Sequence, residues 1–371
     1  MFVFAWAGLG GGEGIALSVA QRLTETHGAS AEVLALTGDE GRARELSTEV
    51  GVPWHPFPMS WPPTRAGRLA SLVGATRALR ALRPDVLMPY CSFPNTVCGL
   101  VWRGTGAALS VWHQVDVLPA GRVGARLATR AARMTPLLIS NSEHGARYLV
   151  DAFGVDPARV VAVRQGVDAV PAREDGPAWR ARLGIGEDVF TATMVANLHR
   201  HKDHATLLRA WRTVVDELAA GGREAVLLLA GRPAGSEDAC KAVAYDLGLG
   251  SNVRFLGEID DVAGLVVASD VGVLSSRAEG LSRSVLEYMA FGRPVVGTDI
   301  PGIREALGPG CDAELAPAGD AAGLAGALLR LADDPALCAS VAARNSARAG
   351  SEFDLGRQVD RELEVIAGRL A

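Results

Sequence analysis

Two glutamates separated by seven residues are the strongest candidates for chemistry. Glu279 lies in a segment of small polar residues after an apolar run, and Glu287 lies about two turns into the helix predicted to follow. The backbone N–H groups of Leu281, Ser282 and Arg283 would open that helix without partners, and such groups attract anions. A carboxylate beside a bound phosphate is costly unless it binds hydroxyl groups, as on a sugar or a ribose. The segment therefore indicates a sugar-nucleotide site.

A second charged cluster, NLHRHKDH at 197–204, precedes another predicted helix. Lys202 and Lys241 are the only lysines among 37 basic residues, and with abundant Ala and Gly this indicates a GC-rich genome. A helix N-terminus attracts anions, and a lysine adds a mobile charge for a diphosphate. The cluster predicts a diphosphate site, while a solvated basic turn remains the alternative.

A glycine-rich run, GLGGGEG at 8–14, follows the first predicted strand. No frame of it completes G-x-G-x-x-G, which argues against a nicotinamide-dependent oxidoreductase. The run could bring backbone close to a ligand, or could form only a tight turn. His113, in VWHQVD at 111–116, ends another apolar run, where it could contact a polar ligand or be structural.

The elements that must position these residues alternate apolar runs with helical stretches, the pattern of parallel sheets covered on both faces. The predicted strands are Met1–Ala7, Ala31–Leu36, Val86–Pro89, Ala108–Trp112, Leu137–Ser140, Val160–Val163, Phe190–Val195, Ala225–Ala230, Val253–Leu256, Val271–Leu274 and Pro294–Thr298. The segment 166–183, with two prolines and no strand pattern, is interpreted as a linker between two α/β halves. The segment 354–371 is predicted to be a helix that packs on either half. Ligands bind at the carboxyl ends of parallel strands, so a cleft between the halves would suit a donor and an acceptor.

Composition excludes several classes. The chain of 371 residues, with 49% hydrophobic and 21% charged residues, favours two soluble globular domains. A net charge of −5 without a basic run argues against nucleic-acid binding. The five cysteines form no C-x-x-C, so neither a disulfide framework nor a zinc site is expected, and the cytoplasm is the expected location. No signal peptide or transmembrane helix is predicted.

The chain resembles the retaining glycosyltransferases of family four, also called group 1, which have the GT-B fold. Glu279 and Glu287 match the E-x7-E motif of that family, and the text EGLSRSVLEYMAFGRPVVGTDIPGIREAL resembles its signature almost throughout. Further matches are GGGEG, HQVD at 113–116, the segment 141–168, NLHRHKDHATLL, LLLAG at 227–231 and VRFLG at 253–257. The resemblance implies an α/β protein of two Rossmann-like, doubly wound parallel-sheet domains that face a central cleft. Residues 1–168 with a returning helix 354–371 would hold the acceptor, and 169–353 would bind the nucleotide sugar.

The resemblance also assigns residues. Lys202 matches the lysine that binds the donor diphosphate, Glu279 the acid near the donor sugar, and His113 the histidine that contacts the transferred sugar; these are the three predicted catalytic residues. Glu287 matches the carboxylate that binds the ribose. The predicted donor-binding residues are Gly11, Gly12, Asn197, Arg200, Lys202, Gly231, Leu256, Leu281, Ser282, Arg283, Ser284 and Glu287. The predicted acceptor-binding residues are Gly12, Glu13, His113 and Asp116.

Three positions depart from the family pattern. Asn197 stands where the family often has an arginine before the phosphate-binding lysine, so Arg200 is the candidate to supply that charge. Gln165 replaces an asparagine. Arg283 is bulkier than the family residue and would narrow or recharge the sugar pocket.

The implied reaction transfers a hexose-type sugar, with retained configuration, from a UDP-sugar or, as second choice, GDP-mannose. The acceptor would be a hydroxyl of a glycan, a glycolipid or a specialised metabolite. No cofactor is expected, and no D-x-D triplet suggests a metal. Two arginine groups suggest peripheral contact with anionic membrane at the inner face, against the alternative of solvated helix faces. They are Arg65, Arg68, Arg77, Arg80 and Arg83, and Arg122, Arg126, Arg130 and Arg133. The rival functions are a sugar-nucleotide epimerase of the same fold and a non-catalytic sugar-nucleotide-binding protein.

Overall fold

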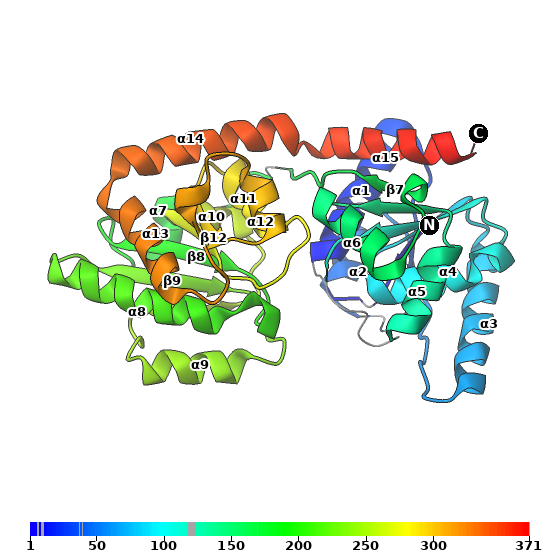
Figure 1. Ribbon diagram of the computed structural model, residues 1–371, viewed down its shortest axis with the longest axis horizontal. Coiled ribbons are helices and arrows are strands. Elements are labelled where there is room, and N and C mark those ends of the chain that lie inside the picture. The colour runs from blue at the N-terminus through cyan, green and yellow to red at the C-terminus, as the bar shows by residue number, and fades with distance from the viewer. Residues whose placement is uncertain are drawn as a thin grey trace. The chain divides into compact units, whose positions relative to one another are not determined.

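The computed structural model describes residues 1–5, 7–8, 11–36, 38, 40–117, 124–168 and 170–370 (Figure 1). Gly10 and Arg122, which belong to the glycine run and to an arginine group, lie outside these residues. The chain divides into one unit of residues 1–165 and 355–371 and a second of residues 166–354. These divisions lie close to the predicted domain boundaries after residues 168 and 353.

The first unit contains a seven-stranded parallel sheet in the order β3-β2-β1-β4-β5-β6-β7. Its strands are β1 (Phe2–Phe4), β2 (Val33–Ala35), β3 (Trp54–Pro56), β4 (Val86–Pro89), β5 (Leu109–Gln114), β6 (Leu137–Ser140) and β7 (Val160–Ala162). Its helices are α1 (Gly11–His27), α2 (Arg42–Glu49), α3 (Arg65–Leu82), α4 (Ser92–Thr105), α5 (Ala125–Met134), α6 (Glu143–Phe153), the short 3₁₀ helix η1 (Pro157–Arg159) and α15 (Leu355–Leu370).

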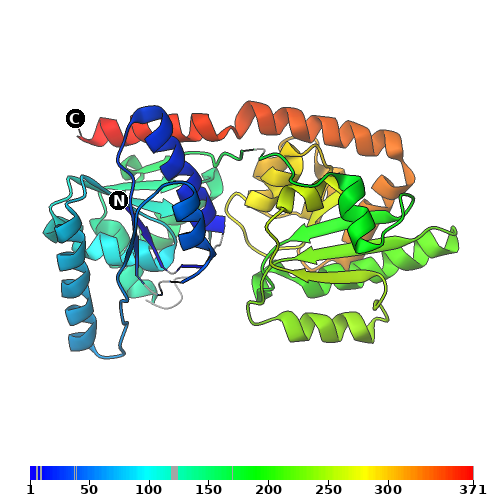
Figure 2. The same ribbon diagram turned by 180° about the vertical axis from the view of Figure 1, so that it is seen from behind.

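Strand alternation divides the first unit into two apolar layers. Phe2 and Phe4 of β1 point into the core that α1 and α15 cover, while Val3 between them points into the core on the opposite face. α15 lies beside α1 and buries Val359 and Ile366 in the first of these cores (Figure 2). The terminal helix therefore belongs to the first unit, as the family resemblance implied.

The second unit contains a six-stranded parallel sheet in the order β10-β9-β8-β11-β12-β13. Its strands are β8 (Phe190–Val195), β9 (Ala225–Ala230), β10 (Val253–Gly257), β11 (Val271–Leu274), β12 (Val295–Thr298) and β13 (Leu315–Ala316). Its helices are α7 (Gly176–Leu183), α8 (His204–Ala220), α9 (Glu237–Asp246), α10 (Val262–Val267), α11 (Arg283–Ala290), α12 (Pro301–Leu307), α13 (Ala321–Asp333) and α14 (Pro335–Glu352), with the 3₁₀ helices η2 (Arg200–Lys202) and η3 (Asp312–Glu314). The fold class predicted from the sequence is confirmed: both units are doubly wound parallel-sheet domains.

Each predicted strand has a counterpart among the described residues, but the two edge strands β3 and β13 were not predicted. β3 is bounded by prolines, and β13 is only two residues long. Proline cannot donate to a ladder, and short strands lack a pattern, so edge strands escape detection. The linker prediction for 166–183 is wrong at its C-terminal end. Asp175 caps α7 there, and Trp179 is buried against the second unit.

No helix among the described residues is both long and apolar enough to cross a membrane. All five cysteines are free thiols.

Candidate active site

Two loops of the second unit meet at the carboxyl edge of its sheet. β8 and β11 are neighbouring strands, so the segments that follow them emerge side by side. The Ser275 hydroxyl, just after β11, lies 3.0 Å from the carbonyl oxygen of Lys202 and 3.1 Å from that of Asp203. The Arg277 N–H donates to the His201 carbonyl at 2.8 Å. These bonds hold the lysine-bearing turn against the glutamate-bearing loop.

Lys202 and Glu279 form an ion pair across this junction. The Lys202 Nζ lies 2.5 Å from Glu279 Oε1, and their side chains are only 17% and 12% exposed. Little water reaches the pair, so its charges are weakly screened. A cation and a carboxylate are therefore held side by side where the turn after β8 meets the loop after β11.

Asp203 fixes the turn that carries Lys202. Its backbone is left-handed, with φ of 51°, and its side chain caps α8 by accepting from the N–H and hydroxyl of Thr206. Aspartate tolerates this conformation better than most residues. Arg277 donates from Nε to Asp203 Oδ2 at 2.8 Å, which ties the cap to the loop after β11. Asp203 and Arg277 therefore support the site from positions that sequence reasoning missed.

Two hydrogen bonds join the first two turns of α11 to Val195, the last residue of β8. The Ser284 hydroxyl donates to the Val195 carbonyl at 2.6 Å, and the Val195 N–H donates to the Tyr288 hydroxyl at 2.6 Å. Burial raises the pKa of the Tyr288 phenol. Ser282 occupies the cap position of α11 without a side-chain capping bond, and Leu281 is buried beneath it. Among the described residues, the Ser282 side chain does not cap the N–H groups of this first turn, which are available to a ligand or to solvent.

Glu287 pairs with Arg283, one turn earlier on α11. Arg283 Nε donates to Glu287 Oε1 at 2.8 Å, and the side chains are 37% and 15% exposed. The predicted ribose carboxylate thus already has one cationic partner.

The remaining predicted donor residues are placed differently. Asn197 Oδ1 accepts from the Arg232 N–H at 3.2 Å, so this side chain closes the turn after β8. Gly231 supports the same turn, because a Cβ there would lie 2.8 Å from the Asn197 nitrogen and would overlap the Ala196 carbonyl. Arg200 is exposed on η2. Leu256 is half-buried in β10, where it packs against the apolar cluster around Trp179. Their roles in donor binding stay predictions.

Two histidines flank Lys202 with weakened basicity. Burial and the Lys202 charge lower the pKa of His201 to about 4, and they lower that of His204 to about 4 as well. His201 Nδ1 lies 2.6 Å from His199 Nδ1, whereas the His204 side chain is buried at the start of α8. Both histidine rings are therefore neutral at pH 7, and Lys202 is the positively charged side chain between them.

Acid is expected to destabilise the protein through His204. The unfolded chain binds a proton at this histidine near pH 6.5 and the folded chain only near pH 4, so the unfolded state gains protons first as the pH falls. The free energy of unfolding should fall by about 2 kcal/mol between pH 7 and pH 5 from this residue. In urea titrations, His204→Gln should remove the share of this residue and leave that of His201, whose pKa is also lowered to about 4, while His27→Gln, at the surface of the first unit, should keep the full difference. An unchanged difference in His204→Gln would contradict this assignment.

In the first unit, the predicted acceptor residues gather around Cys91. A Cβ on Gly12 would lie 2.8 Å from the Cys91 sulfur and 3.4 Å from Val115, whereas Gly11 has open space. Burial raises the pKa of the Cys91 thiol well above its usual value, and the charges of Glu13 and Asp116 raise it further. Glu13 is itself buried in the first turn of α1. The start of α1 therefore lies close to Cys91 and to Val115 just after β5, and the roles of these residues in acceptor binding stay predictions.

His113 is buried in the first unit, with 3% of the residue exposed. Its ring stacks on Tyr90 with centroids 4.3 Å apart; Nδ1 lies 3.3 Å from the Pro89 carbonyl and Nε2 3.6 Å from Glu362 Oε2 of α15. The Asn95 side chain donates to the His113 carbonyl at 2.7 Å and accepts from the His113 N–H at 3.1 Å. A sugar contact would have to displace one of these neighbours, and the role of His113 in the reaction stays a prediction. Tyr90 and Glu362 are partners that the sequence alone did not reveal.

Gly302 is a further residue of the site that sequence reasoning missed, although it lies in the quoted signature. A Cβ at Gly302 would overlap the Gly280 carbonyl oxygen and would lie 2.8 Å from that of Glu279. The first turn of α12 therefore packs directly on the backbone that presents Glu279.

No group of three or more His, Cys, Asp or Glu side chains is placed to hold a metal ion in the described part of the chain.

Comparison with known proteins gives two family matches. Residues 9–170 match the model of Glycosyltransferase Family 4, and residues 189–334 match that of Glycosyl transferases group 1. The first match lies in the first unit apart from its last five residues, and the second match lies within the second unit.

Curated relatives and solved structures agree with these matches. The chain is 31% identical over 244 residues to D-inositol 3-phosphate glycosyltransferase of Thermomonospora curvata, covering 62% of this chain and 56% of that protein. It is 32% identical over 266 residues to the enzyme of that name from Kineococcus radiotolerans, covering 67% and 60%. The alignments thus span less than two thirds of these relatives. Anabaena HepE in complex with UDP-glucose superposes with a TM-score of 0.84 at 20% identity, over 99% of this chain and 100% of HepE. WaaG, a glycosyltransferase involved in lipopolysaccharide biosynthesis, gives 0.75 at 18%, over 99% and 100%.

Proposed function

Because the chain belongs to the family 4, or group 1, glycosyltransferases of the GT-B fold, we propose that it transfers a hexose-type sugar from a nucleotide sugar to an acceptor hydroxyl. The observation that carries the proposal is the Lys202–Glu279 pair, held at 2.5 Å beside the uncapped first turn of α11. This arrangement offers a cation and backbone N–H groups to a diphosphate and a carboxylate to sugar hydroxyls. We propose a UDP-sugar as donor, with GDP-mannose as second choice.

The proposed mechanism places the developing charge on the departing diphosphate. Lys202 and the first turn of α11 stabilise that charge, because fixed donors need no reorganisation as the bond breaks. The acceptor hydroxyl attacks from the face that the leaving group vacates, and the leaving phosphate oxygen takes its proton. The configuration of the sugar is therefore retained. No residue is assigned to a covalent intermediate, and the proposal requires no divalent metal.

Donor binding tests the proposal first. Thermal unfolding in a panel of UDP-sugars and GDP-mannose should show a higher midpoint with the true donor, because a ligand that binds only the folded state stabilises it. For the acceptor, we propose a hydroxyl of a glycan, a glycolipid or a specialised metabolite. The relatives named for D-inositol 3-phosphate make a phosphorylated polyol the first acceptor to test. A protein whose midpoint no nucleotide sugar changes would contradict the proposal.

We also propose that the first unit contacts anionic membrane through α3. One stripe of this helix, at spacings of three or four residues, carries Arg65, Leu69, Val73, Arg77 and Arg80. Leu69 is 64% and Val73 40% exposed, and the three arginines are exposed as well. Apolar side chains flanked by arginines suit the boundary between lipid headgroups and acyl chains.

The protein should therefore sediment with vesicles that contain phosphatidylglycerol and remain in solution with phosphatidylcholine alone. Each basic residue near such a surface contributes about 1 kcal/mol, so Arg77→Glu with Arg80→Glu should weaken binding about tenfold or more. Leu69→Asp should weaken it too, whereas Tyr245→Ser, which changes an exposed residue of α9, should have no effect. Equal sedimentation of all variants would refute the role of α3.

A further inference from the structure

The pair between Arg283 and Glu287 uses only part of each side chain. Arg283 donates from Nε to Glu287 Oε1 at 2.8 Å. Within the described ranges of the chain, its two Nη groups make no hydrogen bond, and Glu287 Oε2 accepts none. The guanidinium is therefore anchored at one nitrogen, with four N–H donors remaining. The carboxylate likewise keeps one oxygen available.

The stability of α11 does not account for this pair. An ion pair four residues apart on a helix contributes only about 0.3–0.5 kcal/mol, and less when the cation precedes the anion. Arg283 is also the first residue of α11, where a positive charge opposes the helix dipole. An arginine at this place is unfavourable for the isolated helix, but it becomes favourable when an anion lies at the helix start.

The turn after β8 brings the Lys202 ammonium group to the site, whereas Asn197, earlier in that turn, is neutral. The Asn197 side chain accepts from the Arg232 N–H in closing the turn. Glu287, by contrast, places a negative charge on the helix that is proposed to hold a diphosphate. The Glu287 carboxylate and a diphosphate held on the same helix would repel each other unless a cation lies between them. Arg283 is the residue bonded to that carboxylate.

We propose that Arg283 determines how the protein recognises the ribose diphosphate part of its donor; this inference rests on the proposed function. Nε fixes the Glu287 carboxylate so that Oε2 accepts a ribose hydroxyl, and the Nη groups donate to the neighbouring phosphate. Arg283 thus acts as a positioning residue for Glu287 and as the second cation of the diphosphate site. A lysine could supply the charge, but it lacks the planar guanidinium that donates to the carboxylate and to the phosphate at the same time.

Calorimetric titration of the full chain with UDP and with 2′-deoxy-UDP tests this assignment. Arg283→Gln should weaken UDP binding about 10- to 100-fold, the range for losing hydrogen bonds to charged groups. It should also remove most of the preference for UDP over 2′-deoxy-UDP, because the carboxylate loses its orientation. Arg283→Lys should recover part of the UDP affinity without that preference. Arg212→Gln breaks a similar Arg–Asp pair on α8 and should leave both values unchanged.

Three results would overturn the inference. In the first, Arg283→Gln binds UDP as the wild type does. In the second, it loses affinity yet keeps the full preference for UDP over 2′-deoxy-UDP, which would mean that Arg283 attracts the diphosphate without orienting Glu287. In the third, Arg283→Lys retains the full preference for UDP over 2′-deoxy-UDP, which would show that the guanidinium group is not needed to orient Glu287. Failure of the wild type to bind UDP or GDP would instead overturn the proposed function, and this inference with it.

Discussion

Lys202→Ala is expected to lower turnover about 10²-fold or more, the scale of removing one preorganised donor from a developing charge. The substitution removes the cation that the turn after β8 holds 2.5 Å from Glu279. It also leaves the Glu279 carboxylate, which is only 12% exposed, without its partner and beside the leaving diphosphate. Both effects raise the energy of the transition state more than that of the bound donor. The loss should therefore fall mainly on kcat, measured by release of nucleoside diphosphate.

The only other lysine of the chain provides the control. Lys241 pairs with Glu237 on the surface of α9, and its side chain is 52% exposed. Lys241→Ala makes the same chemical change and should leave turnover as in the wild type. Turnover within about threefold of wild type in Lys202→Ala would remove this lysine from the mechanism, since one charge contact at such a site contributes far more.

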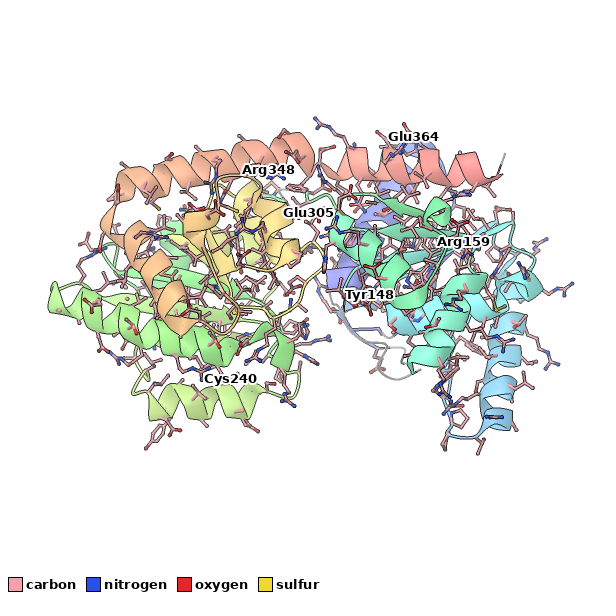
Figure 3. All side chains as sticks on the ribbon, viewed as in Figure 1. Tyr148, Arg159, Cys240, Glu305, Arg348 and Glu364 are labelled. Carbon is pink, nitrogen blue, oxygen red and sulfur yellow. The ribbon has the colours of Figure 1, made fainter. Side chains whose placement is uncertain are left out.

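Gly302→Ala is expected to reduce kcat/KM about 10²-fold although it touches no substrate. The added methyl group would overlap the Gly280 carbonyl, so α12 or the Glu279–Gly280 backbone must move. α12 is held at its far end, because Arg348 of α14 donates to the carbonyls of Ala306 at 2.8 Å and Glu305 at 3.0 Å (Figure 3). The loop is therefore the part that shifts, and a misplacement of about 1 Å in a catalytic group can cost about 10²-fold.

Gly326→Ala is the matched control within the same unit. A Cβ at Gly326 meets nothing within 4 Å, in the interior of α13. This substitution should leave kinetics unchanged and stabilise the helix by about 0.5–1 kcal/mol. Circular dichroism and thermal unfolding must show that Gly302→Ala is folded. A folded Gly302→Ala protein with wild-type kcat/KM would show that the Glu279 loop tolerates displacement.

The sequence predicted the sheets well because buried parallel strands are short, continuous apolar runs. Val86–Pro89, Leu137–Ser140, Phe190–Val195, Ala225–Ala230 and Val271–Leu274 begin and end where they were predicted. The edge strands β3 and β13 and the helix α7 were missed, because a proline-bounded or very short strand and a short capped helix carry little periodicity. Strand order then explains why the segments around Lys202 and Glu279 meet, since β8 and β11 are neighbours.

The partners of individual side chains were harder to predict. Arg283 was recognised as unusual, but its bond to Glu287 depends on the rotamers that both residues adopt on α11. Arg200, the candidate for the charge missing at Asn197, is exposed on η2, and its role stays a prediction. The structure shows Arg283 bonded to Glu287 within the motif. The surroundings of His113 depend on Glu362 and Tyr90, from elements far apart in the sequence. Such contacts follow from packing, which no local pattern encodes.

The proposed transfer is tested by release of nucleoside diphosphate from the donor found by thermal unfolding, with and without an acceptor, together with the anomeric configuration of the product. We expect release only when an acceptor hydroxyl is present, loss of that release in Lys202→Ala, and a product with the configuration of the donor. Three results would contradict the proposed transfer: conversion of the nucleotide sugar to an isomer without acceptor, as an epimerase would give, donor binding without turnover on any acceptor, or an inverted product.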